Sequence, residues 1–319
     1  MTNTAKPKVY FVNPYHQEAI KLSQQSSQVE TVVLSSPEGW HEDANGILLR
    51  SETRITKEDI AKAKNLKVIV KQGVGVDNID IAAAKEAGVI VCNTPAMNSE
   101  SVAELTITLA LTIARRVVEI DRLLKRGEKL VRSKLLGQSL FEKTIGIIGM
   151  GAIGRSVAQK WLGAMNGKVI AYDPFAPEGA WSDIKHQRVT DLNALLKDSD
   201  VITLHVPLTD GTKGMIGKDQ FKIFKPNAIL LNAARGGIVD EDALLEALAN
   251  KQIFGAALDA QNVEPPSLEK HRKHLEHDNL ILTPHVGAST EENQSNSGKF
   301  AVQTILDVLG GKEVPNRVA

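Results

Sequence analysis

The stretch from Ile145 to Gly154 constrains the fold of this chain more than any other. It reads IGIIGMGAIG: an apolar, β-branched run leads into Gly149, Gly151 and Gly154, at the spacing G-x-G-x-x-G, where a helix-like pattern begins. This arrangement is typical of a dinucleotide-binding strand–turn–helix unit. There the first glycine allows the tight turn, the second leaves room for a pyrophosphate, and the third lets helix and strand pack closely.

A carboxylate follows at the position that such a unit requires. The apolar run 169–172 ends in Asp173, nineteen residues after Gly154. A carboxylate there accepts hydrogen bonds from the adenosine ribose hydroxyls and repels a 2′-phosphate. The helix start presents the amides of Ala152 and Ile153 to the phosphates, and the helix dipole adds favourable charge. We therefore expect NAD, in preference to NADP, as the cofactor.

Composition and charge limit the possible partners. The 319 residues are long enough for two domains, and the 38 Lys and Arg residues balance 38 Asp and Glu residues. No overall field attracts nucleic acid or an anionic membrane, so we expect neither as a partner. The single cysteine, Cys92, excludes an intramolecular disulfide framework and fits a reducing compartment. Residues 1–8 contain no apolar signal core and no stretch reaches the length of a membrane span, so a cytoplasmic location is expected.

Two series of short apolar runs alternate with helical segments. The first series lies at 8–12, 29–34, 46–50, 68–71 and 89–92, and the second at 145–148, 169–172, 201–204, 228–231, 254–258 and 280–282. This alternation predicts an α/β fold with two Rossmann-like or flavodoxin-like domains, each a doubly wound parallel sheet. The helix expected at 291–309 returns to the first domain. The domains are therefore expected to comprise residues 1–98 plus 290–319, which are discontinuous, and residues 99–289, which bind NAD.

One long helix is expected over residues 98–115. A capping box at Ser101 to Glu104 would open it, and its apolar residues lie on most of its sides, from Leu105 to Ile113. Such a helix must be covered, either between the domains or by a second subunit. The second option favours a homodimer.

Three histidines recur at three-residue spacing on a polar segment: His271, His274 and His277. No acidic or cysteine pattern completes a metal cage around them. We therefore expect a solvated face and no metal site.

Polar residues follow the runs of the second series, where the carboxyl ends of parallel strands share one edge. They are His205, Asn232, Arg235, Asp259 and His285. Hydride transfer at a hydroxyl carbon needs an acid/base for the hydroxyl proton, a role that suits His285. It also needs a cation for the substrate carboxylate, and Arg235 can bind one through two parallel hydrogen bonds. A carboxylate beside the histidine stabilises its protonated form and orients the ring, and Glu264 is the best candidate.

Each of these three residues alone also fits a structural turn or cap. Their occurrence together, at strand ends of the domain that carries the glycine turn, favours a catalytic set of Arg235, Glu264 and His285.

Ordered motifs along the chain carry a resemblance to a known family. They are GVGVDNID at 73–80, NTP at 93–95, SVAE at 101–104, the glycine turn, HVPLT at 205–209, NAARGG at 232–237 and TPHVG at 283–287. Over essentially its full length the chain resembles the D-isomer-specific 2-hydroxyacid dehydrogenases. The resemblance implies catalysis by the Arg, Glu and His named above, a substrate domain built from both chain ends, an active-site cleft between the domains, and a homodimer. It also implies further cofactor-site positions, at His205, Val206, Pro207, Ala233, Asp259 and Gly287.

The first domain is expected to select the substrate, a small 2-hydroxy or 2-oxo acid. The segment Arg50-Ser51-Glu52-Thr53 resembles one that helps to hold the substrate phosphate in D-3-phosphoglycerate dehydrogenases, and Asn98 and Gln294 are similar to the same subfamily. The backbone at Val74 and Gly75 is expected to hold the carboxylate end. This favours oxidation of 3-phospho-D-glycerate to 3-phosphohydroxypyruvate, an entry to serine biosynthesis. The chain ends at residue 319, so a C-terminal regulatory domain is not expected.

Two alternatives stay open. A general reductase of glyoxylate, hydroxypyruvate or another 2-oxo acid shares the whole catalytic apparatus. An NADH-sensing, corepressor-like scaffold shares the fold, although the chain has none of the usual partner-binding extensions.

Overall fold

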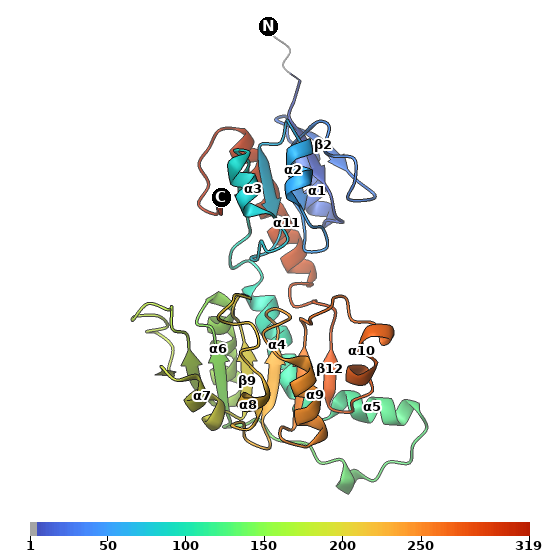
Figure 1. Cartoon of the computed structure of the whole chain (residues 1–319), viewed down its shortest axis with the longest axis vertical. Coiled ribbons are helices and arrows are strands. Elements are labelled where there is room, and N and C mark those ends of the chain that lie inside the picture. Colours follow the sequence, from blue (N-terminus) through green and yellow to red (C-terminus); the bar gives the residue numbers. More distant parts are fainter. Residues whose placement is uncertain (1–4) are drawn as a thin grey trace. The chain divides into compact units, whose positions relative to one another are not determined.

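The computed structural model describes residues 5–319, which form two units that are each organised by one parallel sheet (Figure 1). The first unit comprises Met1–Asn98 and Ala288–Ala319, and the second comprises Ser99–Gly287. The second boundary lies two residues before the position expected from the sequence. Residues 1–4, half of the segment considered for a signal sequence, lie outside the described residues.

The first unit contains a five-stranded sheet in the order β2-β1-β3-β4-β5. Its strands are β1 (Lys8–Phe11), β2 (Glu30–Val33), β3 (Ala44–Leu49), β4 (Val68–Lys71) and β5 (Ile90–Cys92). All pairs are parallel, and every residue of β4 is buried. Continuous apolar runs such as Val68–Val70 therefore suit a sheet that is covered on both faces.

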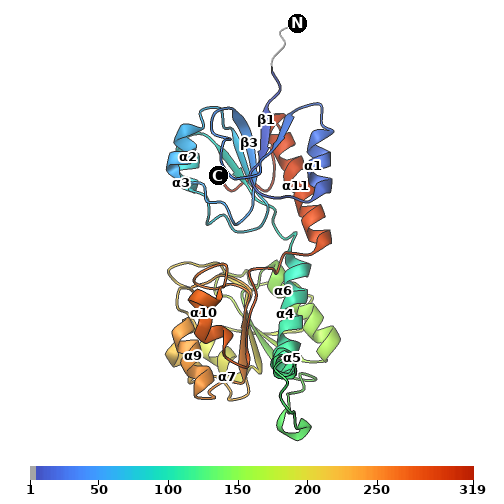
Figure 2. The ribbon, with the colours of Figure 1, turned by 90° about the vertical axis from the view of Figure 1, so that its right-hand side faces the viewer.

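Helices cover both faces of this sheet, with α1 and α11 on one side and α2 and α3 on the other (Figure 2). They are α1 (Gln17–Gln24), α2 (Lys57–Lys62), α3 (Ile81–Glu86) and α11 (Glu291–Leu309). The last helix follows the second unit in sequence but packs against α1, β3 and β4 of the first. Ile305 packs so closely over Gly46 that a Cβ there would come within 2.6 Å of its Cδ1. The return expected of this helix is therefore present.

The second unit contains a seven-stranded sheet in the order β12-β11-β10-β9-β6-β7-β8. Its strands are β6 (Thr144–Ile148), β7 (Lys168–Tyr172), β8 (Gln187–Val189), β9 (Val201–Leu204), β10 (Ile229–Asn232), β11 (Gly255–Leu258) and β12 (Leu280–Leu282). From β6 the strands are added toward one edge of the sheet, through β7 to β8, and from β9 onward they are added toward the other edge. Doubly wound sheets bind ligands at such a switch point, which here lies between β6 and β9. Strand β8 is not among the predicted strands, because its three residues, Gln-Arg-Val, do not form an apolar run.

Helices α4 and α6 lie on one face of this sheet, and α7, α9 and α10 lie on the other (Figure 2). The helices of the unit are α4 (Ser99–Ala114), α5 (Val117–Lys125), the 3₁₀ turn η1 (Arg132–Lys134), α6 (Ala152–Met165), α7 (Leu192–Asp198), α8 (Lys218–Phe221), α9 (Glu241–Ala249) and α10 (Leu268–Leu275). Separate apolar clusters fill the two faces, with Trp161 and Ile147 in one and Phe221 and Leu244 in the other.

The expected start of the long helix is wrong. The helix begins at Ser99, so Ser101 lies in its first turn and does not open it through a capping box. Its buried residues pack mainly against α6, β10, β11 and β12 of its own unit, whereas Leu111 is 36% exposed.

The expected solvated face of histidines is also wrong. His271 is 3% exposed, and its Nδ1 accepts a hydrogen bond from the backbone N of Ser267 at 3.2 Å. The His274 ring packs against it, and burial lowers the pKa of His274 and of His277. These rings face the interior because α10 packs against β12, a contact that residue spacing alone does not predict.

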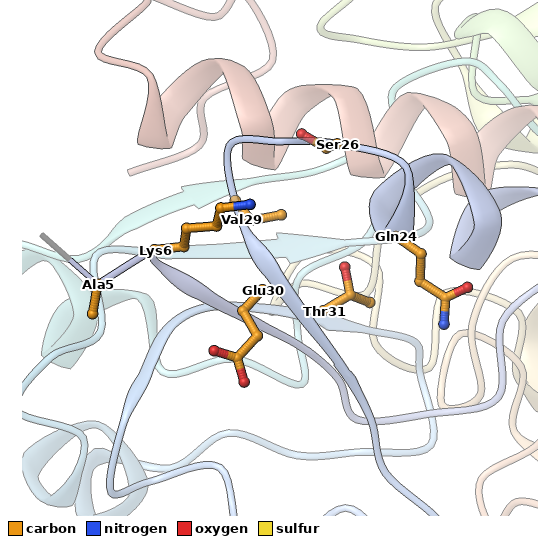
Figure 3. Close-up of a pocket in the computed structure, with 7 residues that line it drawn as sticks. All are labelled: Ala5, Lys6, Gln24, Ser26, Val29, Glu30 and Thr31. Carbon is orange, nitrogen blue, oxygen red and sulfur yellow. The ribbon is translucent and has the colours of Figure 1, made fainter. Parts of the chain in front are cut away.

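Within residues 5–319, no helix is both long and apolar enough to cross a membrane. The same residues contain no cluster of three or more His, Cys, Asp or Glu side chains able to hold a metal ion. A surface depression lies beside the edge strand β2 and is lined by residues that include Lys6, Gln24 and Glu30 (Figure 3). None of the expected site residues lines it.

Candidate active site

The glycine turn between β6 and α6 is tightly packed at its first and third glycines. Gly149 has φ +102°, a conformation that favours glycine, and its amide donates to the carbonyl of Tyr172 at 2.9 Å. A Cβ at Gly149 would overlap the carbonyl of His205, and one at Gly154 would overlap the carbonyl of Gly149. Two of the three glycines are therefore required by the fold itself.

Gly151, the middle glycine, differs from both of them. It precedes the first residue of α6, it is exposed, and a Cβ built on it would meet no atom within 4 Å. The open space lies at a helix start, where the first amides, including those of Ala152 and Ile153, have no carbonyl four residues earlier to bind. This cradle of free amides at the positive end of a helix suits a phosphate group.

Asp173 lies directly after β7, and both of its carboxylate oxygens are held by backbone amides. Oδ2 accepts from Met150 N at 2.9 Å, and Oδ1 accepts from Phe175 N at 2.9 Å. The first bond joins the carboxylate to the glycine turn. Each oxygen keeps a further lone pair, so the carboxylate can still accept hydrogen bonds from two ribose hydroxyls.

His205 follows β9 and faces the protein interior with a neutral ring. Burial lowers its pKa to about 3, and its Nε2 lies 2.9 Å from Thr203 Oγ1. The opposite ring nitrogen, Nδ1, is buried without a hydrogen-bond partner in the described part of the chain. Val206 and Pro207 continue from it along the loop, and Ala233 lies in the corresponding loop after β10.

Arg235 is positioned by the loop that follows β10. Asn232, the last residue of the strand, donates through Nδ2 to the Arg235 carbonyl at 2.8 Å and accepts from Ala234 N at 3.1 Å. A Cβ on the next residue, Gly236, would overlap the carbonyl of Gln261. The segment that carries Glu264 therefore passes directly over the loop that carries Arg235.

Glu264 and His285 form a hydrogen-bonded pair. Nδ1 of His285 lies 3.0 Å from Oε2 and 3.2 Å from Oε1 of Glu264, and the two side chains are 33% and 35% exposed. Burial raises the pKa of Glu264, but the hydrogen bond and charge of His285, the Gln261 amide and the charge of Arg235 outweigh it and leave this pKa below its usual value. The carboxylate is therefore charged near neutral pH, and the histidine Nε2 is left for another partner.

The loop that carries His285 is anchored by Asp259, which is 1% exposed. This carboxylate accepts from Thr283 Oγ1 at 2.6 Å, from Val286 N at 2.8 Å and from Gly287 N at 2.8 Å. His285 itself has φ +54°, an uncommon conformation for a non-glycine residue that such anchoring can maintain. Asp259 and Gly287 thus have an anchoring role besides the cofactor-binding role expected of them, and the sequence carries no signal for it.

In the first unit, Arg50 follows β3 and lies in a network of asparagines. Its backbone N donates to Asn13 Oδ1 at 2.8 Å, and its carbonyl accepts from Asn78 Nδ2 at 3.0 Å. Its guanidinium is 3.9 Å from Glu52 Oε1, while the neighbouring Ser51 is exposed. Neither asparagine was expected from the sequence, because each acts on a loop distant in the chain.

The loop after β4 contains Val74 and Gly75, whose carbonyls are already occupied. Asn93 Nδ2 donates to the Val74 carbonyl at 2.7 Å, and Lys71 Nζ donates to the Gly75 carbonyl at 3.1 Å. Lys71 also donates to Asn78 at 3.2 Å, which links this loop to the Arg50 network. The backbone amides of Val74 and Gly75 donate to no backbone carbonyl within residues 5–319 and can serve as donors to an anion.

The two remaining candidates of the first unit differ in how their side chains are bonded. Gln294 on α11 accepts from Gln72 Nε2 at 3.2 Å and donates to the Ala288 carbonyl at 2.8 Å, so its amide is engaged. Asn98 has a buried Oδ1 with no hydrogen-bond partner among residues 5–319.

Comparison with known proteins decides the family. Residues 107–287 match the model for the NAD-binding domain of D-isomer specific 2-hydroxyacid dehydrogenases. The chain belongs to this family. The matched range contains the glycine turn, Asp173, Arg235, Glu264 and His285. NAD is the cofactor of this domain, and the open cradle at Gly151 together with the Asp173 carboxylate fits it.

Two similar relatives carry different enzyme names. A D-3-phosphoglycerate dehydrogenase of Methanocaldococcus jannaschii is 44% identical over 98% of the chain, and a hydroxypyruvate reductase of Thermotoga maritima is 40% identical over 96% of it. The alignment spans 59% of the first relative and 99% of the second. The chain therefore covers somewhat more than half the length of that dehydrogenase.

A solved structure of a related enzyme also has a fold similar to that of this chain. The D-lactate dehydrogenase of Aquifex aeolicus, complexed with NAD and lactic acid, has a TM-score of 0.85 and 31% identity, and the match covers 98% of each chain.

Proposed function

We propose that this chain is an NAD-dependent dehydrogenase that transfers hydride between NAD and a D-2-hydroxy acid. The observation that carries the proposal is the His285–Glu264 hydrogen bond at 3.0 Å, beside the loop of Arg235 in the unit that contains the glycine turn. An imidazole with a carboxylate on one nitrogen and its other nitrogen available is suited to move the hydroxyl proton.

Each catalytic side chain has one task in this proposal. His285 removes the hydroxyl proton through Nε2, and Glu264 stabilises the imidazolium that forms. Arg235 binds the substrate carboxylate, with the amides of Val74 and Gly75 as further donors. NAD, when bound, supplies the nicotinamide that accepts the hydride. In the opposite direction His285 returns the proton to a 2-oxo acid.

The cofactor contacts follow the strand ends of the second unit. Gly149, Gly151, Ala152, Ile153 and Gly154 form the pyrophosphate cradle, and Asp173 binds the adenosine ribose. Other positions at the same ends of the strands complete the site: His205, Val206, Pro207, Ala233, Asp259 and Gly287.

The proposed substrate is 3-phospho-D-glycerate, oxidised to 3-phosphohydroxypyruvate. The similarity to D-3-phosphoglycerate dehydrogenases of Methanocaldococcus jannaschii and Archaeoglobus fulgidus, at 44% and 42% identity, supports this choice. Arg50 and Ser51 would hold the phosphate, and Asn98 and Gln294 would complete the binding surface of a substrate domain formed by the first unit. The reaction would then feed serine biosynthesis.

A second candidate is reduction of hydroxypyruvate. The Thermotoga maritima enzyme of that name matches the chain over 99% of its own length, which favours an unphosphorylated 2-oxo acid. The catalytic residues are the same for both substrates. The two candidates differ in whether Arg50 binds a substrate phosphate.

We further propose a homodimer in the cytoplasm. Helix α5 and the segment after it extend from the body of the second unit in both views (Figure 1 and Figure 2). Apolar side chains on this segment are exposed, including Leu124 at 59% and Leu136 at 73%. An apolar extension of this kind is suited to a subunit interface. The free, buried thiol of Cys92 suits the reducing cytoplasm.

The test is a comparison of initial rates. NADH formation with 3-phospho-D-glycerate at alkaline pH is measured beside NADH consumption with hydroxypyruvate, glyoxylate and other 2-oxo acids. Activity with phosphoglycerate supports the first candidate, and activity confined to unphosphorylated acids supports the second. NADH binding without turnover of any of these acids contradicts both.

A further inference from the structure

Asp173 begins an exposed loop that leads from β7 toward β8. Pro174, Phe175 and Pro177 are all exposed, and Phe175 reaches 92%. The Phe175 amide bonds back to Asp173 Oδ1 at 2.9 Å, and Ala176 packs against the apolar cluster that contains Trp161 and Ile147. The carbonyls of residues 173–177 are held separately, by a side chain from β8.

Arg188 holds three carbonyls of the loop at once. Nη2 donates to the carbonyl of Asp173 at 3.0 Å and to that of Ala176 at 2.6 Å, and Nη1 donates to that of Pro177 at 2.8 Å. A planar guanidinium with a rigid fork of donors can serve three acceptors, whereas a lysine ammonium on a flexible stem cannot match this geometry.

The sheet fixes the base of Arg188. The residue lies on β8, in parallel register with Ala171 of β7, two residues before Asp173. Its carbonyl contacts therefore brace the loop against the edge of the sheet. On the opposite side, Met150 N of the glycine turn binds Asp173 Oδ2 at 2.9 Å. The carboxylate is thus held between the turn that receives the pyrophosphate and a loop that is tied to β8.

We propose that Arg188 is a positioning residue for the adenosine half of the NAD site. It acts through the backbone of residues 173–177 and touches neither the reacting atoms nor, in this arrangement, the cofactor. Three of its five N–H donors are bonded to these carbonyls, so it fixes the loop that presents the Asp173 carboxylate, whose negative charge repels a 2′-phosphate. The inference rests on the proposed use of NAD and adds a residue that maintains the preference for NAD over NADP.

The deciding experiment compares NADH with reduced nicotinamide mononucleotide, which lacks the adenosine half. Dissociation constants are measured by fluorescence titration for wild type, Arg188→Met and Arg188→Lys. The control is Arg272→Met, which removes an exposed arginine of α10 that is paired with Glu276. Hydrogen exchange of the loop amides in the ligand-free proteins gives a second readout.

We expect Arg188→Met to weaken NADH binding about tenfold or more, since a loosened loop must be ordered on binding. Binding of the mononucleotide should stay within about twofold of wild type, because the nicotinamide half does not use this loop. Arg188→Lys should recover only part of the NADH affinity, loop exchange should accelerate in both Arg188 variants, and the control should match wild type. The ratio of NADPH to NADH affinity should rise in Arg188→Met.

Three results would overturn the inference and leave the proposed function standing. Unchanged NADH affinity in Arg188→Met would show that the loop keeps its shape without Arg188. Equal weakening of NADH and the mononucleotide would indicate general damage to the unit. A selective loss of NADPH binding would make Arg188 a direct phosphate ligand. A wild-type protein that binds no NADH would contradict the proposed function as well.

Discussion

Nδ1 of His285 lies 3.0 Å from Oε2 of Glu264, across 21 residues of sequence. The two residues stand in different loops, one after β11 and the other after β12. The pair is formed because Gln261 N holds Glu264 Oε1 at 3.2 Å while Asp259 holds the backbone beyond His285. Two short loops with separate anchors thus place one acid/base side chain against one carboxylate.

Replacement of the histidine tests its role in proton transfer. Asparagine tolerates the left-handed backbone at φ +54°, so His285→Asn should fold normally. We expect turnover to fall by about 10²- to 10⁴-fold, the usual contribution of a general acid/base. The NADH dissociation constant should change little, as measured by fluorescence titration. Turnover close to wild type would reject the assignment.

Replacement of the glutamate tests its charge separately from its hydrogen bond. Glu264→Gln keeps an acceptor near His285 but removes the negative charge that favours an imidazolium. Reduction of a 2-oxo acid takes its proton from that imidazolium, so kcat/KM for reduction should fall about tenfold or more in Glu264→Gln. The measurement is kcat/KM for reduction between pH 5 and 9. Identical profiles for variant and wild type would exclude an electrostatic role for Glu264.

The glycine turn offers a matched pair of substitutions. Gly154→Ala should destabilise the second unit by about 1–3 kcal/mol, because its Cβ would overlap the Gly149 carbonyl. Gly151→Val should leave the melting temperature nearly unchanged, since a Cβ there meets no atom within 4 Å, but should weaken NADH binding more than about tenfold.

Gly163→Ala is the control for that pair. A Cβ at Gly163, on the same helix, also meets no atom within 4 Å, and this position lies outside the proposed site. The control should bind NADH as wild type does. Equal NADH affinity in Gly151→Val and in this control would place the phosphates elsewhere.

Arg50→Ala separates the two substrate candidates. Loss of a charged hydrogen bond to phosphate should raise KM for 3-phospho-D-glycerate by about 10- to 100-fold and leave KM for glyoxylate nearly unchanged. Lys57→Ala, which removes a cation 3.9 Å from Glu86 on the surface of the same unit, is the control. A similar rise for both substrates in Arg50→Ala would argue against phosphate recognition.

Acid should weaken the attachment of the C-terminal helix. Hydrogen bonds from Ser295 and Lys299, both on α11, lower the pKa of Glu18 on α1 to about 2. The unfolded value is about 4.3, so the stabilising contribution is complete above that pH and disappears as the pH falls toward 2. Glu18→Gln should therefore melt at a lower temperature than wild type at pH 7, and the difference should vanish near pH 2. A difference that does not vary with pH would contradict this linkage.

The sequence alone predicted the positions of every described strand except β8, the glycine turn and the candidate residues. The runs 68–71 and 201–204, which are apolar except for Lys71 and Thr203, became fully buried strands, because a run with apolar residues on both faces needs a sheet covered on both faces. The spacing from Gly154 to Asp173 was similarly informative, since it spans one helix and one strand.

Only the tertiary structure decided which side chains meet. The edge strand β8 was not predicted, because Gln187–Val189 contains a single apolar residue and is held in the sheet by its pairing with β7. Asp259 anchors the His285 loop, and Arg188 braces the Asp173 loop, through bonds to backbone atoms that carry no residue-specific signal. The periodicity of apolar residues in the sequence indicates which residues are buried. A hydrogen bond between distant loops depends instead on where the fold places its donor and its acceptor.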